Sequence, residues 1–226
     1  MSRADFVKYQ CAKSSVLFAV GHELRNKAQN WLQKEVLLYE EGFSDQEFSA
    51  SKTISTHFPT RILCVGSSHP GKGFSDFISA IQLFEKSEPS FEGIECVLTG
   101  DPIEITNRNS LKSKFEFVGR IENLIDFARG FDLAIHPSRH ESFGLAPLEL
   151  IIAGIPTLVS RTGVIESLGI SDKWCFEPNN PLAMAEKLRA LFLKWDISEP
   201  EIVSLQETIR RNFSLADKSV DFAAVL

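Results

Sequence analysis

The chain has 226 residues, of which 43% are hydrophobic and 24% are charged, and its formal net charge is −6. This length and composition suit a globular protein with a sizeable hydrophobic core. The acidic balance argues against a nucleic-acid-binding surface, which normally needs a dominant basic face. No apolar run approaches the roughly 20 residues that cross a bilayer, and residues 1–13 do not resemble a secretory signal. We therefore expect a cytoplasmic protein without a transmembrane segment, while peripheral membrane contact stays open.

The first 60 residues predict only a small piece of α/β structure. Residues 15–20 and 35–39 are apolar and typical of strands, and residues 22–33 between them are typical of a helix. Residues 40–60 are polar, rich in Ser and Thr, and without period, which indicates a linker or crossover loop. The expected division of the chain is a first unit at residues 1–45, a linker at residues 46–60 and a main domain at residues 61–226.

From residue 61 onward, short β-branched runs alternate with helical patterns. This alternation predicts an α/β fold that is Rossmann-like, with a parallel sheet and helices on both faces. In the first of these helices, Phe74, Phe77, Ile78 and Ile81 follow a period near 3.6 and are expected to face the core. The expected strands are residues 61–65, 94–98, 115–118, 132–136, 156–159 and 174–176. The expected helices are residues 74–86, 121–128, 145–153, 163–168, 181–193 and 201–212.

The glycine-rich loop at residues 66–73, GSSHPGKG, lies between an expected strand and an expected helix. Backbone N–H groups and the helix dipole favour a phosphate at such a position. The loop also matches the P-loop pattern GxxxxGK, but Gly73 stands where Ser or Thr should bind magnesium, and Pro70 removes one amide. The alternative is a plain turn with a solvated Lys72.

A second candidate site is the segment HESFGLAPLE at residues 140–149, which contains the start of the helix expected at residues 145–153. This helix should direct the amides near Phe143, Gly144 and Leu145 toward the carboxyl end of the sheet, where open α/β folds bind ligands. Gly144 would let a phosphate approach the backbone closely.

Two carboxylates in this segment, Glu141 in the loop and Glu149 one turn into the helix, could bracket a ligand. Carboxylates suit sugar hydroxyls, which donate hydrogen bonds. The alternative is that Glu141 is a favourable charge near a helix N-terminus and Glu149 a partly exposed helix residue.

Other polar residues carry weaker signals. Arg120 follows Gly119 at a strand end, on the same sheet edge as both loops, where it could contact a nucleotide or simply be a surface arginine. His136 and His140 are four residues apart, but Pro137 separates them, so we expect structural or solvated histidines and no metal site. The cysteines lack metal-binding spacing and are expected to be reduced: Cys11, Cys64, Cys96 and Cys175.

Taken together, three segments resemble the C-terminal domain of retaining glycosyltransferases of family 4, which have the GT-B fold. They are residues 61–81, with the glycine-rich loop, residues 115–120, FEFVGR, and residues 131–168, which contain an E-x7-E pattern. The resemblance extends from about residue 14 to the end of the chain. The third segment is the most specific, because its strand, loop, E-x7-E, Gly-x-Pro and next strand follow the family's order.

The resemblance implies a nucleotide-diphosphate sugar as donor, transfer with retention, and no cofactor or metal. It implies that Glu141 faces the donor sugar, that Glu149 holds ribose hydroxyls and that Lys72 pairs with the diphosphate. Amides of Gly144 and Leu145 would stabilise charge on the leaving nucleotide. The complete expected donor site comprises Gly66, Ser67, Lys72, Arg120, Glu141, Phe143, Gly144, Leu145 and Glu149, with Glu141 and Lys72 as its catalytic residues.

The sequence departs from the family pattern at two loops. The family's Gly-Arg is Gly66-Ser67 here, so one of two expected cations is missing, and Arg120 or Arg161 could substitute for it. The family's Gly-Gly-x-Pro-Glu is TGVIE at residues 162–166, so its sugar contacts are not carried over.

A GT-B enzyme also needs an N-terminal domain that holds the acceptor, and only residues 15–39 resemble part of one. We therefore expect residues 1–45 to be a remnant of that domain, and transfer to require an acceptor-binding domain or a separate subunit. The alternatives are a non-catalytic nucleotide-sugar-binding module and, third, a P-loop-like phosphate-transfer enzyme.

Overall fold

The computed structural model describes residues 3–14, 16–20, 22–39, 42–48, 54–106 and 108–214. Its main domain is built on a six-stranded sheet with the strand order β5-β4-β3-β6-β7-β8. Every neighbouring pair in this sheet is parallel, which confirms the predicted Rossmann-like α/β fold. The strands are β3 (Arg61–Cys64), β4 (Glu95–Leu98), β5 (Lys114–Phe117), β6 (Leu133–His136), β7 (Thr157–Ser160) and β8 (Cys175–Phe176).

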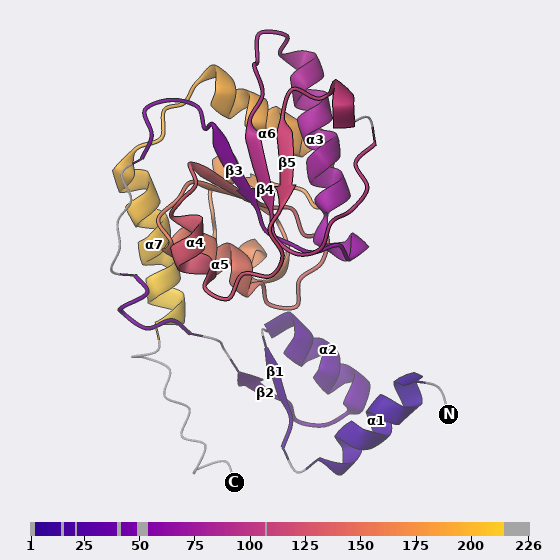
Figure 1. Ribbon diagram of the computed structural model, residues 1–226. Helices are drawn as coiled ribbons and strands as arrows, with labels where there is room; N and C mark the ends of the chain where they lie inside the picture. Colours follow the sequence, from indigo (N-terminus) through magenta and orange to yellow (C-terminus); the bar gives the residue numbers. More distant parts are fainter. Residues whose placement is uncertain are drawn as a thin grey trace.

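Helices cover both faces of this sheet (Figure 1). On one face, α3 (Phe74–Ser87) and α6 (Pro181–Leu193) pack against each other. On the other face, α5 (Leu145–Ile152) contacts both α4 (Leu124–Ala128) and α7 (Glu199–Phe213). This layering leaves the two ends of the sheet as the places where loops can build a site.

Two of the expected helices differ from those observed. The helix expected at residues 121–128 begins only at Leu124, because the side chain of Asn123 accepts a hydrogen bond from the Asp126 amide at 3.0 Å and caps it. The helix expected at residues 163–168 is a short 3-10 turn, η3 (Gly163–Ser167). Its Val164 amide donates to the Phe143 carbonyl at 2.8 Å, so a tertiary contact ties this turn to the loop before α5.

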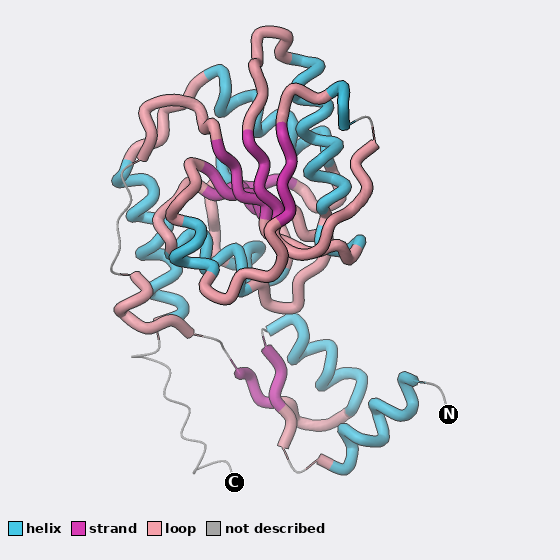
Figure 2. The backbone as a smooth tube through the Cα atoms, viewed as in Figure 1, coloured by secondary structure: helices cyan, strands magenta, loops and turns pink. Residues whose placement is uncertain are grey.

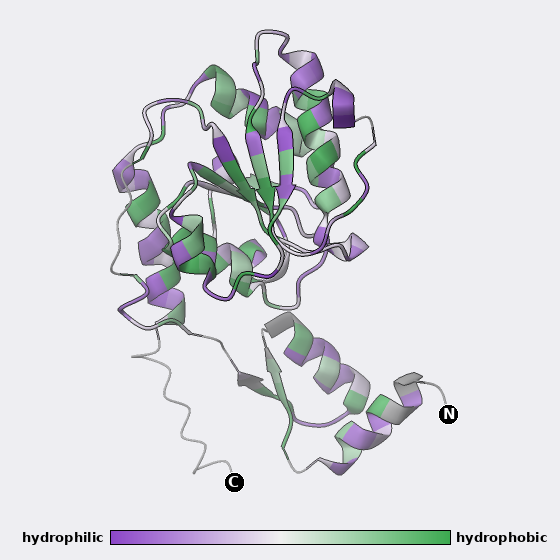
Figure 3. Cartoon of the chain, in the orientation of Figure 1, coloured by the Kyte–Doolittle hydropathy of each residue, from purple (hydrophilic) through white to green (hydrophobic). Residues whose placement is uncertain are grey.

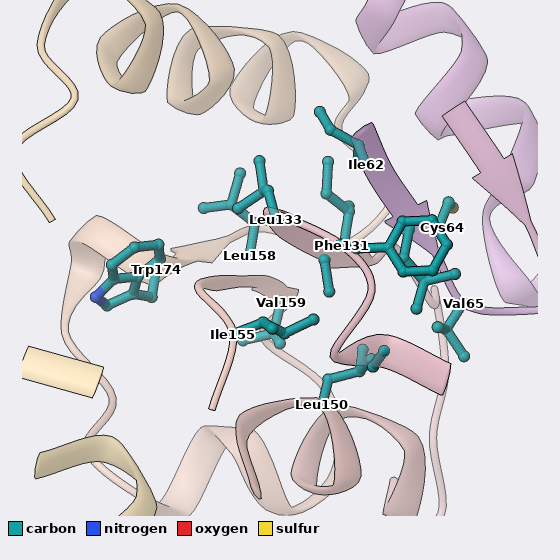
Figure 4. Close-up of a cluster of buried hydrophobic side chains, with 14 of the residues drawn as sticks. Ile62, Cys64, Val65, Phe131, Leu133, Leu150, Ile155, Leu158, Val159 and Trp174 are labelled. Atoms are coloured by element: carbon teal, nitrogen blue, oxygen red, sulfur yellow. The ribbon is translucent and has the colours of Figure 1, made fainter. Parts of the chain in front are cut away.

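The core lies between the central strands and the helices. β6 and β7 are buried along their whole length, as expected for parallel strands covered on both faces. Figure 4 shows Leu133 and Leu158 from these strands with Leu150 of α5 and Trp174. Figure 3 shows hydrophobic residues on the strands at the centre of the main domain.

Part of the segment before the main domain packs into this core. Phe43 and Phe48 are buried, and the Phe43 amide donates to the carbonyl of Phe213 in α7 at 2.8 Å. Phe58 joins an aromatic cluster on the α3–α6 side, where its ring centroid lies 5.1 Å from that of Phe192. The residues between these phenylalanines are mostly polar, so the sequence pattern predicted a linker and gave no sign of these core contacts.

The N-terminal unit contains a second, two-stranded parallel sheet of β1 (Phe18–Val20) and β2 (Leu37–Tyr39), joined by α2 (His22–Leu32) (Figure 2). These elements agree with the expected ones but have shorter strands. A further helix, α1 (Arg3–Lys13), was not predicted, because its sequence has no clear apolar period. Within the described part of the chain, no helix has the length and apolar character needed to cross a bilayer.

Candidate active site

Glycine turns follow β3, β4 and β5 and meet at the carboxyl edge of the sheet. The Gly100 amide donates to the Gly119 carbonyl at 2.6 Å, and a Cβ atom on Gly100 would lie 3.1 Å from the Ser67 Cα atom. The Gly66 amide donates to the Thr99 hydroxyl at 3.0 Å. The structure therefore brings Gly66, Ser67 and the exposed Arg120 to one edge through close backbone packing.

The glycine-rich loop closes as a 3-10 turn, η1 (Pro70–Lys72), whose amides are used within the turn. The Gly71 amide donates to Nδ1 of His69 at 3.1 Å, and the Lys72 amide donates to the His69 carbonyl at 2.8 Å. A P-loop, in contrast, directs a row of backbone N–H groups at the phosphates. This turn offers a ligand mainly the ammonium group of Lys72.

Gly73 fits its position only because it has no side chain. Its φ angle is +73°, and a Cβ atom there would lie 2.0 Å from the Pro137 carbonyl oxygen. A Ser or Thr at this position would collide with the backbone. The hydroxyl that a P-loop needs is therefore incompatible with this fold, which argues against the phosphate-transfer alternative.

The loop after β6 is fastened to the start of α3. The Arg139 guanidinium binds the carboxylate of Asp76 at 2.6 and 2.7 Å, and the Arg139 amide donates to the Gly71 carbonyl at 2.8 Å. The Ser138 hydroxyl donates to the same carbonyl at 3.2 Å, while its own carbonyl accepts from Ser160 at 2.6 Å. These bonds fix the segment that ends at Glu141.

Glu141 lies in a cluster with two nitrogen groups from other elements. Nζ of Lys72 lies 2.7 Å from its Oε1 atom, and Nε2 of His136 lies 3.3 Å from the same oxygen. Burial alone raises the pKa of Glu141, but hydrogen bonding to His136 and Lys72 outweighs burial and lowers the pKa to about 2. The structure therefore holds a carboxylate that is ionised throughout the physiological range.

His136 is the functional candidate that the sequence patterns missed, since it was expected to be structural or solvated. It ends β6 and its side chain is only 3% exposed, so its contact with Glu141 is formed inside the protein. The available signal was its position at the end of the strand that leads directly to Glu141.

The start of α5 lies beside this cluster. Gly144 is the N-cap, with a φ angle of +96°, and a Cβ atom there would lie 3.6 Å from the Glu141 side chain. Because Gly144 has no side chain to cap the helix, the amide of Ala146 at the second helical position has no partner from that source, and the amide of Leu145 at the first position is one that a helix leaves without an intrahelical partner. Phe143 is different: its ring is buried and lies 5.6 Å, centroid to centroid, from that of Phe213. Only the backbone of Phe143 belongs to this site.

Gly163 is the glycine that remains in the altered TGVIE loop. A Cβ atom on Gly163 would lie 2.4 Å from the Phe143 carbonyl oxygen and 3.0 Å from the Cβ atom of Glu141. Thr162 stands at the position of the first glycine in the family pattern. It is buried, and its hydroxyl lies 3.3 Å from that of Ser160. The loop has thus kept glycine where its approach to the site requires one.

The cleft in front of Glu141 has a volume of about 420 Å³ and is closed on one side by α2. Leu24 and Lys27 come from α2, and Arg161 also lines the cleft. The guanidinium of Arg161 is ion-paired with Asp172 and lies 3.7 Å from Glu177. Arg161 thus reaches the cleft with its charge already partly neutralised.

Glu149 lines a second hollow, with Ser44, Glu47, Asn123 and Arg129 among its neighbours. Burial, followed by the nearby Glu47 carboxylate, raises the pKa of Glu149. The two glutamates of E-x7-E thus have opposite electrostatic environments. Among the described residues, no group of three or more His, Cys, Asp or Glu side chains is arranged to hold a metal ion.

Comparisons with known proteins agree with this architecture. The family model described as glycosyl transferases group 1 matches residues 59–194. A GDP-mannose-dependent alpha-(1-6)-phosphatidylinositol dimannoside mannosyltransferase of Mycobacterium tuberculosis is 31% identical over 108 residues, which cover 48% of this chain and 25% of that protein. A glycogen synthase of the same species is 28% identical over 113 residues, 46% of this chain and 27% of that protein.

Among solved structures, HepE of Anabaena in complex with UDP and glucose has the same fold. The TM-score is 0.73 at 15% identity, over 94% of this chain and 62% of that one. The chain therefore spans about a quarter of the two sequence relatives and under two thirds of this structure.

The close approach of Gly73 to Pro137 gives a first prediction. Gly73→Ala should lower the free energy of unfolding by roughly 2–4 kcal/mol, through backbone strain and overpacking. Gly119→Ala is the matched control, because Gly119 has a φ angle of +74° and nothing within 4 Å of a Cβ atom. It should cost only about 1 kcal/mol of strain. Urea denaturation measures both, and equal losses would contradict the proposed clash.

The low pKa of Glu141 gives a second prediction. Because its pKa falls from 4.5 to about 2 on folding, Glu141 stabilises the protein above pH 4.5 and loses this effect as the pH falls toward 2. Glu141→Gln should therefore be destabilising near pH 6, by at most about 3 kcal/mol, and progressively less so below pH 4.5.

Glu149→Gln provides the control with the opposite sign. A raised pKa makes ionisation of Glu149 cost stability as the pH rises, so removing the charge should help more at pH 6 than at pH 4. Urea denaturation across this pH range tests both variants. Parallel pH profiles for the two would refute the assignment of opposite environments.

Proposed function

The chain belongs to the glycosyl transferases group 1 family, and we propose that its main domain binds the nucleotide-sugar donor of a retaining transferase. The observation that carries this proposal is the Glu141 carboxylate, which is held 2.7 Å from Lys72 beside the start of α5. An anion, a cation and the start of a helix gathered around Glu141 match a donor that has both sugar hydroxyls and a diphosphate.

Each part of this cluster has a proposed role in transfer. Lys72 and the amides of Gly144 and Leu145 bind the diphosphate and stabilise the charge that it gains as the leaving group. Glu141 accepts hydrogen bonds from the sugar and stabilises positive charge near its anomeric carbon. These groups belong to the protein, so we propose that no metal ion or cofactor takes part.

We propose that the nucleoside part of the donor extends toward Arg120 and Glu149. The hollow at Glu149 also contains Asn123 and Ser44, whose polar side chains suit ribose hydroxyls. Burial and the Glu47 carboxylate raise the pKa of Glu149, because both disfavour its charge. A ribose hydroxyl that donates a hydrogen bond to this carboxyl group would stabilise it. Gly66 and Ser67 would contact the donor through the tightly packed turn after β3.

Transfer to an acceptor requires a second wall for the cleft. Here α2 supplies Leu24 and Lys27 to that wall, and we propose that a further domain or subunit presents the acceptor. The described cysteines are all free thiols, which agrees with a reducing compartment such as the cytoplasm.

Donor binding gives a third prediction. UDP-, GDP- and ADP-sugars should be screened by thermal shift, and the correct donor at 100 times its Kd should stabilise the fold by about 2.7 kcal/mol. Glu149→Gln should weaken this response at the same ligand concentration. Glu92→Gln, at the opposite end of the sheet, is the control and should leave it unchanged. A response to ATP that requires magnesium, with none to nucleotide sugars, would refute the proposed function.

A further inference from the structure

The two partners of Glu141 differ in their freedom to move. Lys72 lies at the end of the turn η1, and its side chain is 37% exposed. His136 belongs to the buried strand β6, between β3 and β7, and its side chain is 3% exposed. One partner can follow a ligand into the cleft, whereas the other is fixed by the sheet.

Donor binding places competing demands on Lys72. In the structure its ammonium group is bound to Glu141, whereas the proposed function requires it at the diphosphate. A diphosphate carries more negative charge than one carboxylate and therefore attracts the ammonium more strongly. When Lys72 moves away, Glu141 keeps its burial, at 11% exposure, and burial favours the protonated, neutral acid.

We propose that His136 is the positioning residue that keeps Glu141 ionised and aimed into the cleft while Lys72 binds the diphosphate of the donor. The inference rests on the proposed function for the movement of Lys72. The role of His136 rests on the geometry, because its Nε2 atom lies close to the same Glu141 oxygen as Lys72 and belongs to a buried strand. A neutral imidazole can do this by donating its Nε2–H group.

Other charged groups cannot readily replace Lys72 at Glu141. Arg139 is bound bidentately to Asp76, and Arg161 is paired with Asp172. Among the described residues, the titratable or charged side chains that line the cleft with Glu141 are Lys27, Arg139, His140, Arg161 and Glu166. His136 is thus the nitrogen partner of Glu141 that stays in place, while the buried Ser138 hydroxyl adds a weaker hydrogen-bonding contribution to the low pKa of Glu141.

The test follows the Glu141 carboxyl group directly, by its carbon chemical shift during a pH titration. Lys72→Met imitates the departure of Lys72 without any ligand, and the midpoint should stay below 4.5 because His136 remains. Combining Lys72→Met with His136→Leu should move the midpoint above 4.5. His136→Gln, which retains an N–H donor, should restore part of the shift in the Lys72→Met background.

Two results would overturn the proposal. One is a midpoint above 4.5 in Lys72→Met alone, and the other is no change on adding His136→Leu. If His136→Leu fails to fold, nitrogen spectra of the wild-type imidazole decide the question. A proton on Nε2 at neutral pH supports the proposal, whereas a neutral ring with its proton only on Nδ1 contradicts it.

Adding UDP to the wild-type protein separates this inference from the proposed function. If UDP binds, the Glu141 midpoint should move toward that of Lys72→Met, and an unmoved midpoint would refute the exchange of Lys72. If UDP, GDP and ADP all fail to bind, the proposed function fails. The titrations of the His136 variants would still show whether this residue holds Glu141.

Discussion

The contact between Gly73 and the carbonyl of Pro137 is the constraint on which the site depends. It lets the turn after β3 lie directly against the loop after β6, and the Arg139–Asp76 ion pair locks the two together. Only with this spacing can Lys72 reach Glu141, which is 69 residues away in the sequence. A side chain at position 73 would push apart the two halves of the site.

Electrostatic balance follows from that contact. A carboxylate at 11% exposure would normally favour its neutral form, but two nitrogen groups on one oxygen reverse the preference. For the second glutamate of the E-x7-E pattern, burial and the nearby Glu47 carboxylate both raise the pKa instead. One helix and the loop before it thus present an ionised carboxylate to one hollow and a carboxyl with raised pKa to another. These two environments suit different parts of one donor.

The N-terminal unit lines one side of the cleft. Its α2 helix faces the carboxyl edge of the main sheet, while residues 42–48 are anchored to α7 by Phe43 and Phe48. A donor site walled on two sides is consistent with chemistry that must hold reactants together and exclude water.

The sequence by itself determined the fold class, the places of the strands along the chain and the positions of both candidate loops, because alternation, glycine turns and E-x7-E are local patterns. It could not determine that Lys72 pairs with Glu141, that His136 joins them, or that the Phe143 ring belongs to the core. Those facts depend on β3 and β6 being neighbours in one register, which brings residues distant in sequence within hydrogen-bonding distance. The sequence showed that Gly73 replaces the Ser or Thr of the P-loop pattern. Only the tertiary structure gave the reason, which is that a side chain at this position would collide with the carbonyl oxygen of Pro137.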